Sequence, residues 1–237
     1  MYFVDHRNAL VEQKSILIKI SALVNILNYM RAYYSDYLND RKLRKYIDYN
    51  MLDNTRKIDL AKYDNSWYHI GASRLKCILW YFTNIFFFLN PLVPLVGLKV
   101  KLLRLFGAKV GKGVVIKPSV NIKYPWNLKI GNYVWIGENV WIDNLVEVSI
   151  GDNVCISQGA MLLCGNHNYK KTSFDLMVGK IMIEEGAWVG AQSVVCPKVT
   201  IHSHAVLAVG SVASHDLDEY AVYQGNPAIK VRDRKIL

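Results

Sequence analysis

The sequence predicts an all-β fold, a left-handed parallel β-helix of hexapeptide repeats, with an α-helical extension at its N-terminus. Three observations support this prediction. An aliphatic residue returns at every sixth position from Val110 onward, and a small or β-branched residue follows four positions later in most repeats. Glycine or an acid often comes directly after the aliphatic residue. Neither the 3.6-residue period of a helix nor the two-residue period of a simple strand fits this pattern.

The repeat runs in four stretches, which are separated by two short slips and one long insertion. Its fourteen aliphatic positions are Val110, Ile116, Ile122, Ile130, Ile136, Ile142, Ile150, Ile156, Leu162, Ile183, Val189, Val195, Ile201 and Leu207. In such a repeat each hexad forms one short strand and a turn, and three hexads close a triangular coil around inward-pointing aliphatic residues. Fourteen hexads on three faces therefore predict between four and five coils. We expect the glycines to provide the backbone angles of the turns.

The chain divides into four predicted segments. Residues 1–55 form a helical extension, which is either a partner-binding helix or an artefact of an upstream start. Residues 56–109 form a helical and apolar module that covers the open end of the solenoid, as terminal repeats require. The β-helix spans residues 110–215 and is interrupted by a loop at residues 163–182. A C-terminal tail follows at residues 216–237.

The chain is 52% hydrophobic and 20% charged, which excludes wholesale disorder, and its net charge is +10. Residues 61–129 hold eleven Lys and Arg against the single acid Asp64. These cations surround an apolar run, Cys77–Leu89, of about 13 residues, which is too short to span a bilayer. Either residues 77–109 touch a membrane interface, or a helix packs over the end of the main domain. Because the cations are interleaved with apolar residues rather than with a stacking platform, nucleic-acid binding is disfavoured.

The four cysteines form no C-x-x-C pair and lie among apolar residues, so we expect free thiols in a reducing compartment. We therefore expect a cytoplasmic protein, with peripheral contact at the inner face of the cell membrane as the alternative location. Cys164 lies three residues before His167 and is either a nucleophile or a buried spectator thiol, of which we favour the second. His202 and His204 alternate, but no third ligand has a suitable spacing, so no metal is expected.

The insertion begins with Asn166, His167, Asn168 and Tyr169, at the point where a strand turns into a loop. Imidazole is largely neutral yet basic near pH 7, so His167 can take a proton from a hydroxyl group as a bond forms. A backbone carbonyl or a neighbouring amide would fix its tautomer, and Asn144 is a candidate one coil below. Taken alone, a histidine in a polar loop is more often a surface residue.

These residues resemble the hexapeptide-repeat acetyltransferases, and within them the colanic acid biosynthesis acetyltransferases. The resemblance is carried by the hexads, by the loop with His167, and by the motifs Tyr63–Trp67, Leu105–Lys109 and Gly225–Ala228. It implies an acetyl-CoA-dependent O-acetyltransferase that acts on a sugar hydroxyl during cell-surface or exopolysaccharide biosynthesis. It also implies a homotrimer with its clefts between subunits, and a carbohydrate acceptor that is free or lipid-linked.

The resemblance further implies roles for individual residues. His167 is the general base. The acceptor contacts are Asn144, Asn166, Asn168 and Tyr169. The coenzyme contacts are Trp188, Ala191, Val209, Gly210, Ser211, Ser214, Lys230 and Arg232. Trp188 has a second interpretation, in which its ring covers a corner of the β-helix. Relatives carry Lys directly after Gly-Asn-Pro-Ala, whereas this chain has Ile229 there and Lys230 one position later.

Two other functions compete with the acetyltransferase. A non-catalytic β-helix scaffold would present the N-terminal helices to a partner or a membrane. A β-helix metalloenzyme of the carbonic anhydrase type would need three histidines at a subunit interface, and one loop histidine is too few. The sequence also leaves open which sugar hydroxyl is acetylated and whether the donor carries acetyl or a larger acyl group.

Overall fold

The computed structural model describes residues 24–25, 27–32 and 57–237. The chain separates into two units, Met1–Lys57 and Ile58–Leu237. Most of the predicted helical extension lies outside the described residues, and residues 24–25 and 27–32 are helical and exposed. In the described part of the chain, no helix is both long enough and apolar enough to cross a membrane.

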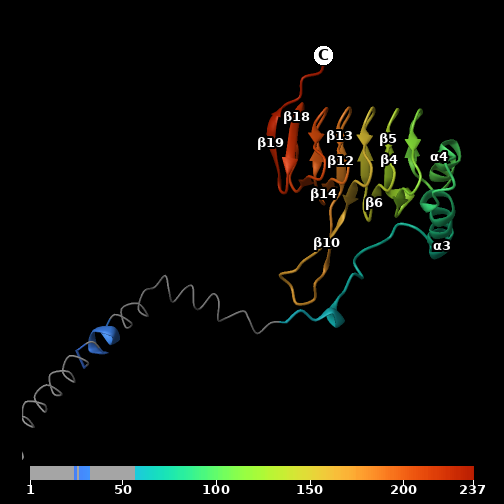
Figure 1. Cartoon of the computed structure of the whole chain (residues 1–237). Coiled ribbons are helices and arrows are strands. Elements are labelled where there is room, and N and C mark those ends of the chain that lie inside the picture. The colour runs from blue at the N-terminus through green and yellow to red at the C-terminus, as the bar shows by residue number, and fades with distance from the viewer. Residues whose placement is uncertain (1–23, 26, 33–56) are drawn as a thin grey trace, which may run out of the picture. The chain divides into compact units, whose positions relative to one another are not determined.

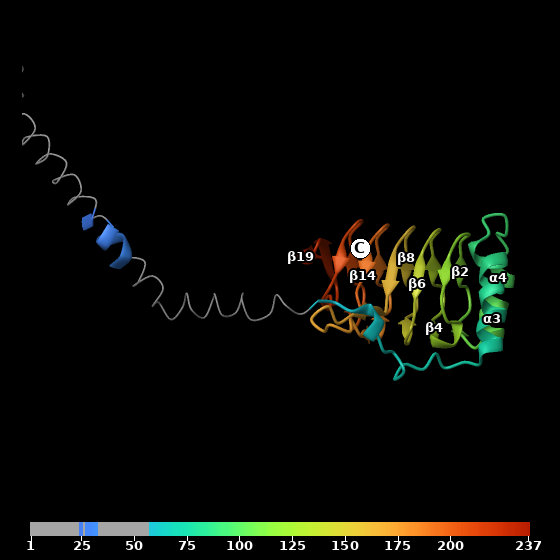
Figure 2. The same cartoon turned by 90° about the horizontal axis from the view of Figure 1, so that it is seen from below.

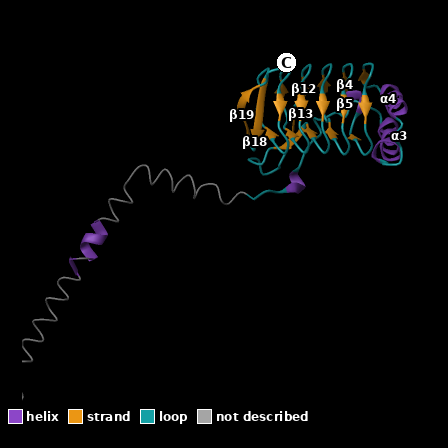
Figure 3. Ribbon diagram, turned by 45° about the horizontal axis from the view of Figure 1, so that its top comes forward, coloured by secondary structure: helices purple, strands orange, loops and turns teal. Residues whose placement is uncertain are grey.

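The second unit is a solenoid of three parallel sheets, here called faces A, B and C (Figures 1 and 3). Face A contains β1 (Lys109–Val110), β4 (Leu128–Ile130), β7 (Val148–Ile150), β12 (Ile181–Ile183) and β15 (Thr200–Ile201). Face B contains β2 (Val115–Ile116), β5 (Trp135–Ile136), β8 (Cys155–Ile156), β13 (Trp188–Val189), β16 (Val206–Leu207), β18 (Ala221–Gly225) and the antiparallel β19 (Ala228–Asp233). Face C contains β3 (Asn121–Ile122), β6 (Trp141–Asp143), β9 (Met161–Leu163), β14 (Val194–Val195) and β17 (Val212–Ala213). The predicted parallel β-helix is confirmed.

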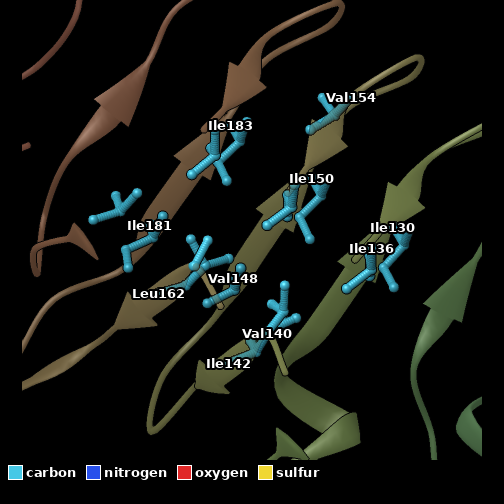
Figure 4. Packing of buried hydrophobic residues seen from close by; sticks show 14 of the residues in the cluster. Ile130, Ile136, Val140, Ile142, Val148, Ile150, Val154, Leu162, Ile181 and Ile183 are labelled. Carbon is cyan, nitrogen blue, oxygen red and sulfur yellow. The ribbon is translucent and has the colours of Figure 1, made fainter. Parts of the chain in front are cut away.

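The aliphatic positions form one continuous column inside the solenoid. Thirteen of the fourteen are at most 4% exposed, and Val110 at the first coil is half-buried. Equivalent residues stack from coil to coil, as Ile130 does on Ile150 (Figure 4). The chain completes five coils and begins a sixth, so the expectation of four to five coils was too low. The fifteenth position is Ala213, whose small side chain falls outside the aliphatic pattern although it is buried on face C.

The expectation that glycines provide the turn angles holds for those late in a hexad, such as Gly113 (φ 67°) and Gly159 (φ 66°), but not for those directly after the aliphatic residues. The left-handed residues come later in each hexad, as with Asn139 (φ 58°) and Asn153 (φ 58°). Gly137 and Gly151 are required for a different reason. A Cβ atom on either would lie 2.7–2.8 Å from a backbone nitrogen of the next coil. These two glycines therefore permit close stacking of the coils.

A helical cap closes the first coil. It consists of α3 (Arg74–Thr83), the π-helix η2 (Asn84–Leu89) and α4 (Val96–Leu105), and it lies at the β1–β3 end of the solenoid (Figure 1). Ser73 caps α3 by accepting a hydrogen bond from the backbone N–H of Lys76. Trp80 and Phe88 are buried against the coil, whereas much of the remaining apolar surface of α3 and η2 is exposed.

One side chain of the cap reaches each face of the first coil and satisfies its open-edge carbonyl groups. On face A, Arg104 donates to the carbonyl oxygens of Val110 and Gly111. After face B, the buried Nζ of Lys99 donates to Lys117 O at 3.0 Å, and burial lowers the pKa of this amine. On face C, the indole N–H of Trp80 donates to Ile122 O at 2.9 Å. The cap is therefore bound by hydrogen bonds as well as by apolar packing.

Trp80→Phe tests this interaction, because it keeps an aromatic ring on the coil and removes only the indole N–H. The buried carbonyl of Ile122 then loses its donor, which costs about 1–3 kcal/mol. We expect the urea unfolding midpoint to fall by a corresponding amount. Trp67→Phe is the matched control, since Trp67 is 53% exposed. Equal midpoints for the two variants would contradict the role assigned to Trp80.

Candidate active site

The long insertion contains a hairpin rather than only a loop. β10 (Gly165–His167) and β11 (Leu176–Val178) pair in antiparallel fashion, with His167 opposite Leu176. The hairpin leaves the solenoid between β9 on face C and β12 on face A, and it projects away from the coils (Figure 1). Its turn is closed by the Asn168 N–H, which donates to Asp175 O at 2.8 Å, and by an ion pair between Lys171 and Asp175 at 2.8 Å.

His167 is held in one orientation by Phe174. Its Nδ1 lies 3.0 Å from the carbonyl oxygen of Phe174, and the two rings stack with centroids 4.5 Å apart and an 8° interplanar angle. A carbonyl oxygen only accepts hydrogen bonds, so Nδ1 carries the proton. In the neutral ring Nε2 is then unprotonated and able to act as a base. The carbonyl of Phe174, not the amide of Asn144, fixes the tautomer.

An extended arm, residues 58–73, runs along the outside of the solenoid from the hairpin to α3 (Figure 2). Three hydrogen bonds attach it. The N–H of Asp59 donates to Thr172 O, the hydroxyl of Tyr68 donates to Leu145 O at 2.6 Å, and Trp126 donates its indole N–H to Ile70 O at 2.7 Å. Burial raises the pKa of the Tyr68 phenol, so this group stays neutral and remains a donor.

The arm, the hairpin and the coil edges enclose a polar cavity of about 610 Å³ that contains His167. The cavity is lined by Tyr63, Asn65, Ser66, Tyr68, Ile70, Lys123, Tyr124, Asp143, Leu145, Gly165, Asn166, His167 and Leu176. Lys123 and Asp143 form an ion pair at 2.8 Å within this lining. The volume and the mixed apolar and hydrogen-bonding lining suit a small polar ligand.

Of the four predicted acceptor contacts, only Asn166 lines this cavity. Asn144 is fully buried, and its amide both accepts from the N–H and donates to the carbonyl oxygen of Tyr124. Asn144 therefore lies outside the cavity and holds the backbone of Tyr124, which lines it. Asn168 shapes the turn by accepting from the N–H of Lys170, and Tyr169 is 72% exposed outside the cavity lining of this chain.

Sequence reasoning missed the arm, Lys123, Tyr124 and Asp143. The polar and aromatic motif Tyr63–Trp67 was the available signal for the arm, because it lies outside the hexads and has no role in the solenoid column. The available signal for the other three residues was the slip in the repeat, because Lys123 and Tyr124 lie in the first slip and Asp143 lies in the second. These corners of the coils reach the cavity because the hairpin and the arm meet beside them.

The predicted coenzyme residues before β17 lie mostly on face B or in the turns that follow it. Trp188 is on face B, 46% exposed, with its indole N–H donating to Ser157 Oγ at 2.9 Å. Ala191 and Gly210 occupy the turns that follow face B on adjacent coils, joined by a hydrogen bond from Gly210 N to Ala191 O at 2.9 Å. Val209 is 69% exposed beside them. Ser214 is exposed in the segment after β17 on face C.

The C-terminal tail forms the β18–β19 hairpin at the last coil. Ser211 is buried and accepts a hydrogen bond from Gly225 N, so its hydroxyl holds this hairpin. Lys230 pairs with Asp233 at 2.9 Å, and Arg232 is exposed on β19. Arg234, which sequence reasoning did not select, anchors the tail by donating to the carbonyl oxygens of Gly186 and His204 at 2.9 Å.

Comparison with known proteins identifies the family. The chain is 38% identical over 164 residues to an Escherichia coli K12 protein named "Putative colanic acid biosynthesis acetyltransferase WcaF", covering 69% of this chain and 90% of that protein. The chain belongs to the hexapeptide-repeat acetyltransferase family. The predicted acyltransferase class is therefore confirmed. No protein-family model matches the chain.

Solved structures of other hexapeptide-repeat acetyltransferases share the fold. A galactoside acetyltransferase in complex with coenzyme A is 26% identical, with a TM-score of 0.55 over 60% of this chain and 72% of that one. A Vibrio cholerae hexapeptide-repeat acetyltransferase complexed with acetyl coenzyme A is 24% identical, with a TM-score of 0.56 over 59% of this chain and 78% of that one.

Cys164 is unsuited to a nucleophilic role in this acetyltransferase. It is fully buried, its Sγ lies 3.7 Å from Val146 O, and burial raises the pKa of its thiol to about 12. A thiolate is the reactive form, so almost none is present near neutral pH. Among the described residues, no three His, Cys, Asp or Glu side chains are grouped to hold a metal ion.

Thiol labelling of the folded acetyltransferase tests the state of Cys164. Iodoacetamide at pH 8 is expected to label the partly exposed Cys77 and to leave Cys164 unmodified, because its pKa of about 12 keeps it protonated. Labelling of Cys164 is expected to rise only as the pH approaches that value or the chain unfolds. Peptide mass spectrometry measures both sites in one sample. Equal labelling of the two cysteines at pH 8 would refute the assignment.

Proposed function

We propose that the protein transfers an acetyl group from acetyl-CoA to a sugar hydroxyl, during the synthesis of a cell-surface polysaccharide. The observation that carries the proposal is His167, which lines a polar cavity with its Nδ1 fixed on the carbonyl of Phe174. The name of the Escherichia coli relative supports the polysaccharide role, and the two coenzyme-bound neighbours support the donor. The donor supplies an activated thioester.

In this mechanism the acceptor sugar lies in the cavity, where Asn166, Asp143 and Tyr63 offer hydrogen-bonding groups. Nε2 of His167 removes the proton of the acceptor hydroxyl as the oxygen bonds to the thioester carbonyl carbon. The carbon–sulfur bond then breaks, and the coenzyme thiolate takes the proton back from the imidazolium. Transfer is direct, because the thioester is already activated and both substrates are held together. The backbone N–H of Ala191 is the proposed oxyanion donor.

The proposed site is shared between subunits of a homotrimer. Within one chain His167 belongs to the hairpin between faces C and A, whereas Trp188, Ala191 and Gly210 lie on or after face B. Face B exposes Trp135 (62%) and Trp188 (46%) on its outer surface, and face C exposes Trp141 (41%). Exposed tryptophans on two neighbouring faces are typical of a protein interface. A ring of subunits places face B of one beside the hairpin of the next.

The setting of His167 favours an enzyme over a scaffold. A scaffold would explain the solenoid, but it gives no role to a histidine with a fixed tautomer inside a polar cavity. The coenzyme side is proposed to use Trp188, Ala191, Val209 and Gly210 along the edge of face B, with Ser214, Lys230 and Arg232 from the later segments. Ser211 acts indirectly, since its hydroxyl holds Gly225 in the tail.

His167→Ala tests the base. We expect the rate of CoA release from acetyl-CoA in the presence of a panel of methyl glycosides to fall by about 10²- to 10⁴-fold, the usual contribution of a general base. The KM for acetyl-CoA should change little, because His167 acts on the acceptor hydroxyl. The control is His202→Ala, at a partly exposed histidine beside Glu184. Unchanged turnover in His167→Ala would remove His167 from the mechanism.

Mixing two inactive variants tests the shared site. His167→Ala removes the base, and Ala191→Trp blocks the proposed coenzyme site. Each alone should assemble normally and lack activity. Co-expressed chains should regain about a quarter of the wild-type sites, because that fraction of interfaces joins an intact His167 to an intact Ala191. Absence of recovery in verified mixed trimers would place the whole site within one chain.

A further inference from the structure

A second cavity opens beside the proposed active site and differs from it in chemistry. It has a volume of about 860 Å³ and lies between the helical cap and face C. Its lining is mostly apolar and consists of Cys77, Ile78, Trp80, Tyr81, Phe82, Asn84, Ile85, Leu89, Asn121, Ile122, Lys123, Tyr124, Trp141 and Asp143. We call this cavity the apolar groove. Several of its side chains are well exposed, among them Ile78 (54%), Tyr81 (62%) and Phe82 (51%).

The apolar groove adjoins the polar cavity. Lys123, Tyr124 and Asp143 line both spaces. A ligand seated by the polar cavity at one end therefore has an apolar channel leading away from it. The polar cavity presents hydrogen-bonding groups around His167, and across the shared residues the apolar groove presents aliphatic and aromatic groups of α3 and η2.

This arrangement fits a ligand with a polar head and a hydrocarbon chain. Exposed apolar side chains in a concave site indicate an apolar occupant. The shared residues place that occupant next to the acceptor and on the side of face C, whereas the coenzyme residues of the same chain lie mostly on or after face B. The polar residues at the junction, Lys123 and Asp143, separate the two parts of such a ligand.

We propose that the acceptor is a lipid-linked saccharide, whose sugar lies in the polar cavity and whose hydrocarbon chain lies in the apolar groove. This inference rests on the proposed function, because it assigns the acceptor of the same transfer. The chain leaves the sugar at the junction and passes along Ile78, Phe82 and Trp141. Arg74 on α3 and Lys101 on α4 are exposed cations of the cap and favour an acceptor held at an anionic lipid surface.

The test compares methyl and decyl forms of the same panel of glycosides, used with the full chain and below their critical micelle concentrations. The proposal predicts a KM at least about tenfold lower for the decyl form of an accepted sugar, because its chain leaves water. Ile78→Gln should remove most of this preference without changing the KM of the methyl form. Leu79→Gln is the matched control, since Leu79 is equally exposed at 52% on the same helix but does not line the groove.

A binding measurement separates the groove from the chemistry. A decyl glycoside with a diazirine at the chain terminus is photoactivated on the protein, and labelled peptides are identified by mass spectrometry. We expect label on the segments that carry Ile78, Phe82 and Trp141, and its loss in Ile78→Gln. Labelled segments with no acetyl transfer to any glycoside would support the groove and overturn the proposed function.

Three results would overturn the groove assignment. The first is acetyl transfer with equal KM values for methyl and decyl glycosides and no label in the groove, which leaves the proposed function intact. The second is an equal loss of preference in Ile78→Gln and Leu79→Gln, which indicates a general membrane-contacting surface. The third is a changed oligomeric mass in Ile78→Gln, which indicates that a second copy of the chain fills the groove.

Discussion

The close stacking of successive coils is the constraint on which the rest of this structure depends. Parallel strands repeat at about 4.8 Å, and every coil must present the same shape to its neighbours. The glycines at Gly137 and Gly151 show how little room remains, since a single methyl group would meet the next backbone. Insertions are therefore excluded from the faces and confined to corners. The hairpin that carries His167 leaves the solenoid at the corner between β9 and β12. The rigid column therefore fixes the two ends of this protruding hairpin.

The repeat made the solenoid predictable because one requirement acts on every coil. The interior column admits Ile, Val or Leu at each hexad, so the same signal for the fold is repeated at fourteen positions of the sequence. Positions that do not need a large aliphatic side chain were predicted less well. Ala213 completes the fifth coil with too small a side chain to be counted, and the glycines directly after the aliphatic residues serve coil contact rather than turn geometry.

The candidate site was less predictable, because its parts come from segments that share no period. His167 could be selected from its place in an insertion, and Asn166 came with it. The partner that orients the ring is a backbone carbonyl of Phe174, which no side-chain pattern reveals. Asn144 shows the opposite case, since a polar residue near an insertion turned out to be buried and to support Tyr124. Asp143, its neighbour in sequence, reaches the cavity instead because side chains alternate along a strand.

The two ends of the solenoid are closed by different means. Arg104, Lys99 and Trp80 bond the first coil's carbonyl groups, and the antiparallel strand β19 covers face B of the last coil. A column of parallel strands with bare ends would act as a template for further strands and grow into a fibre. The cap and β19 therefore disfavour growth along the axis and leave the sides of the column open to contact. In the proposed homotrimer, contact through these sides would be finite and would leave grooves between neighbours where small molecules can enter.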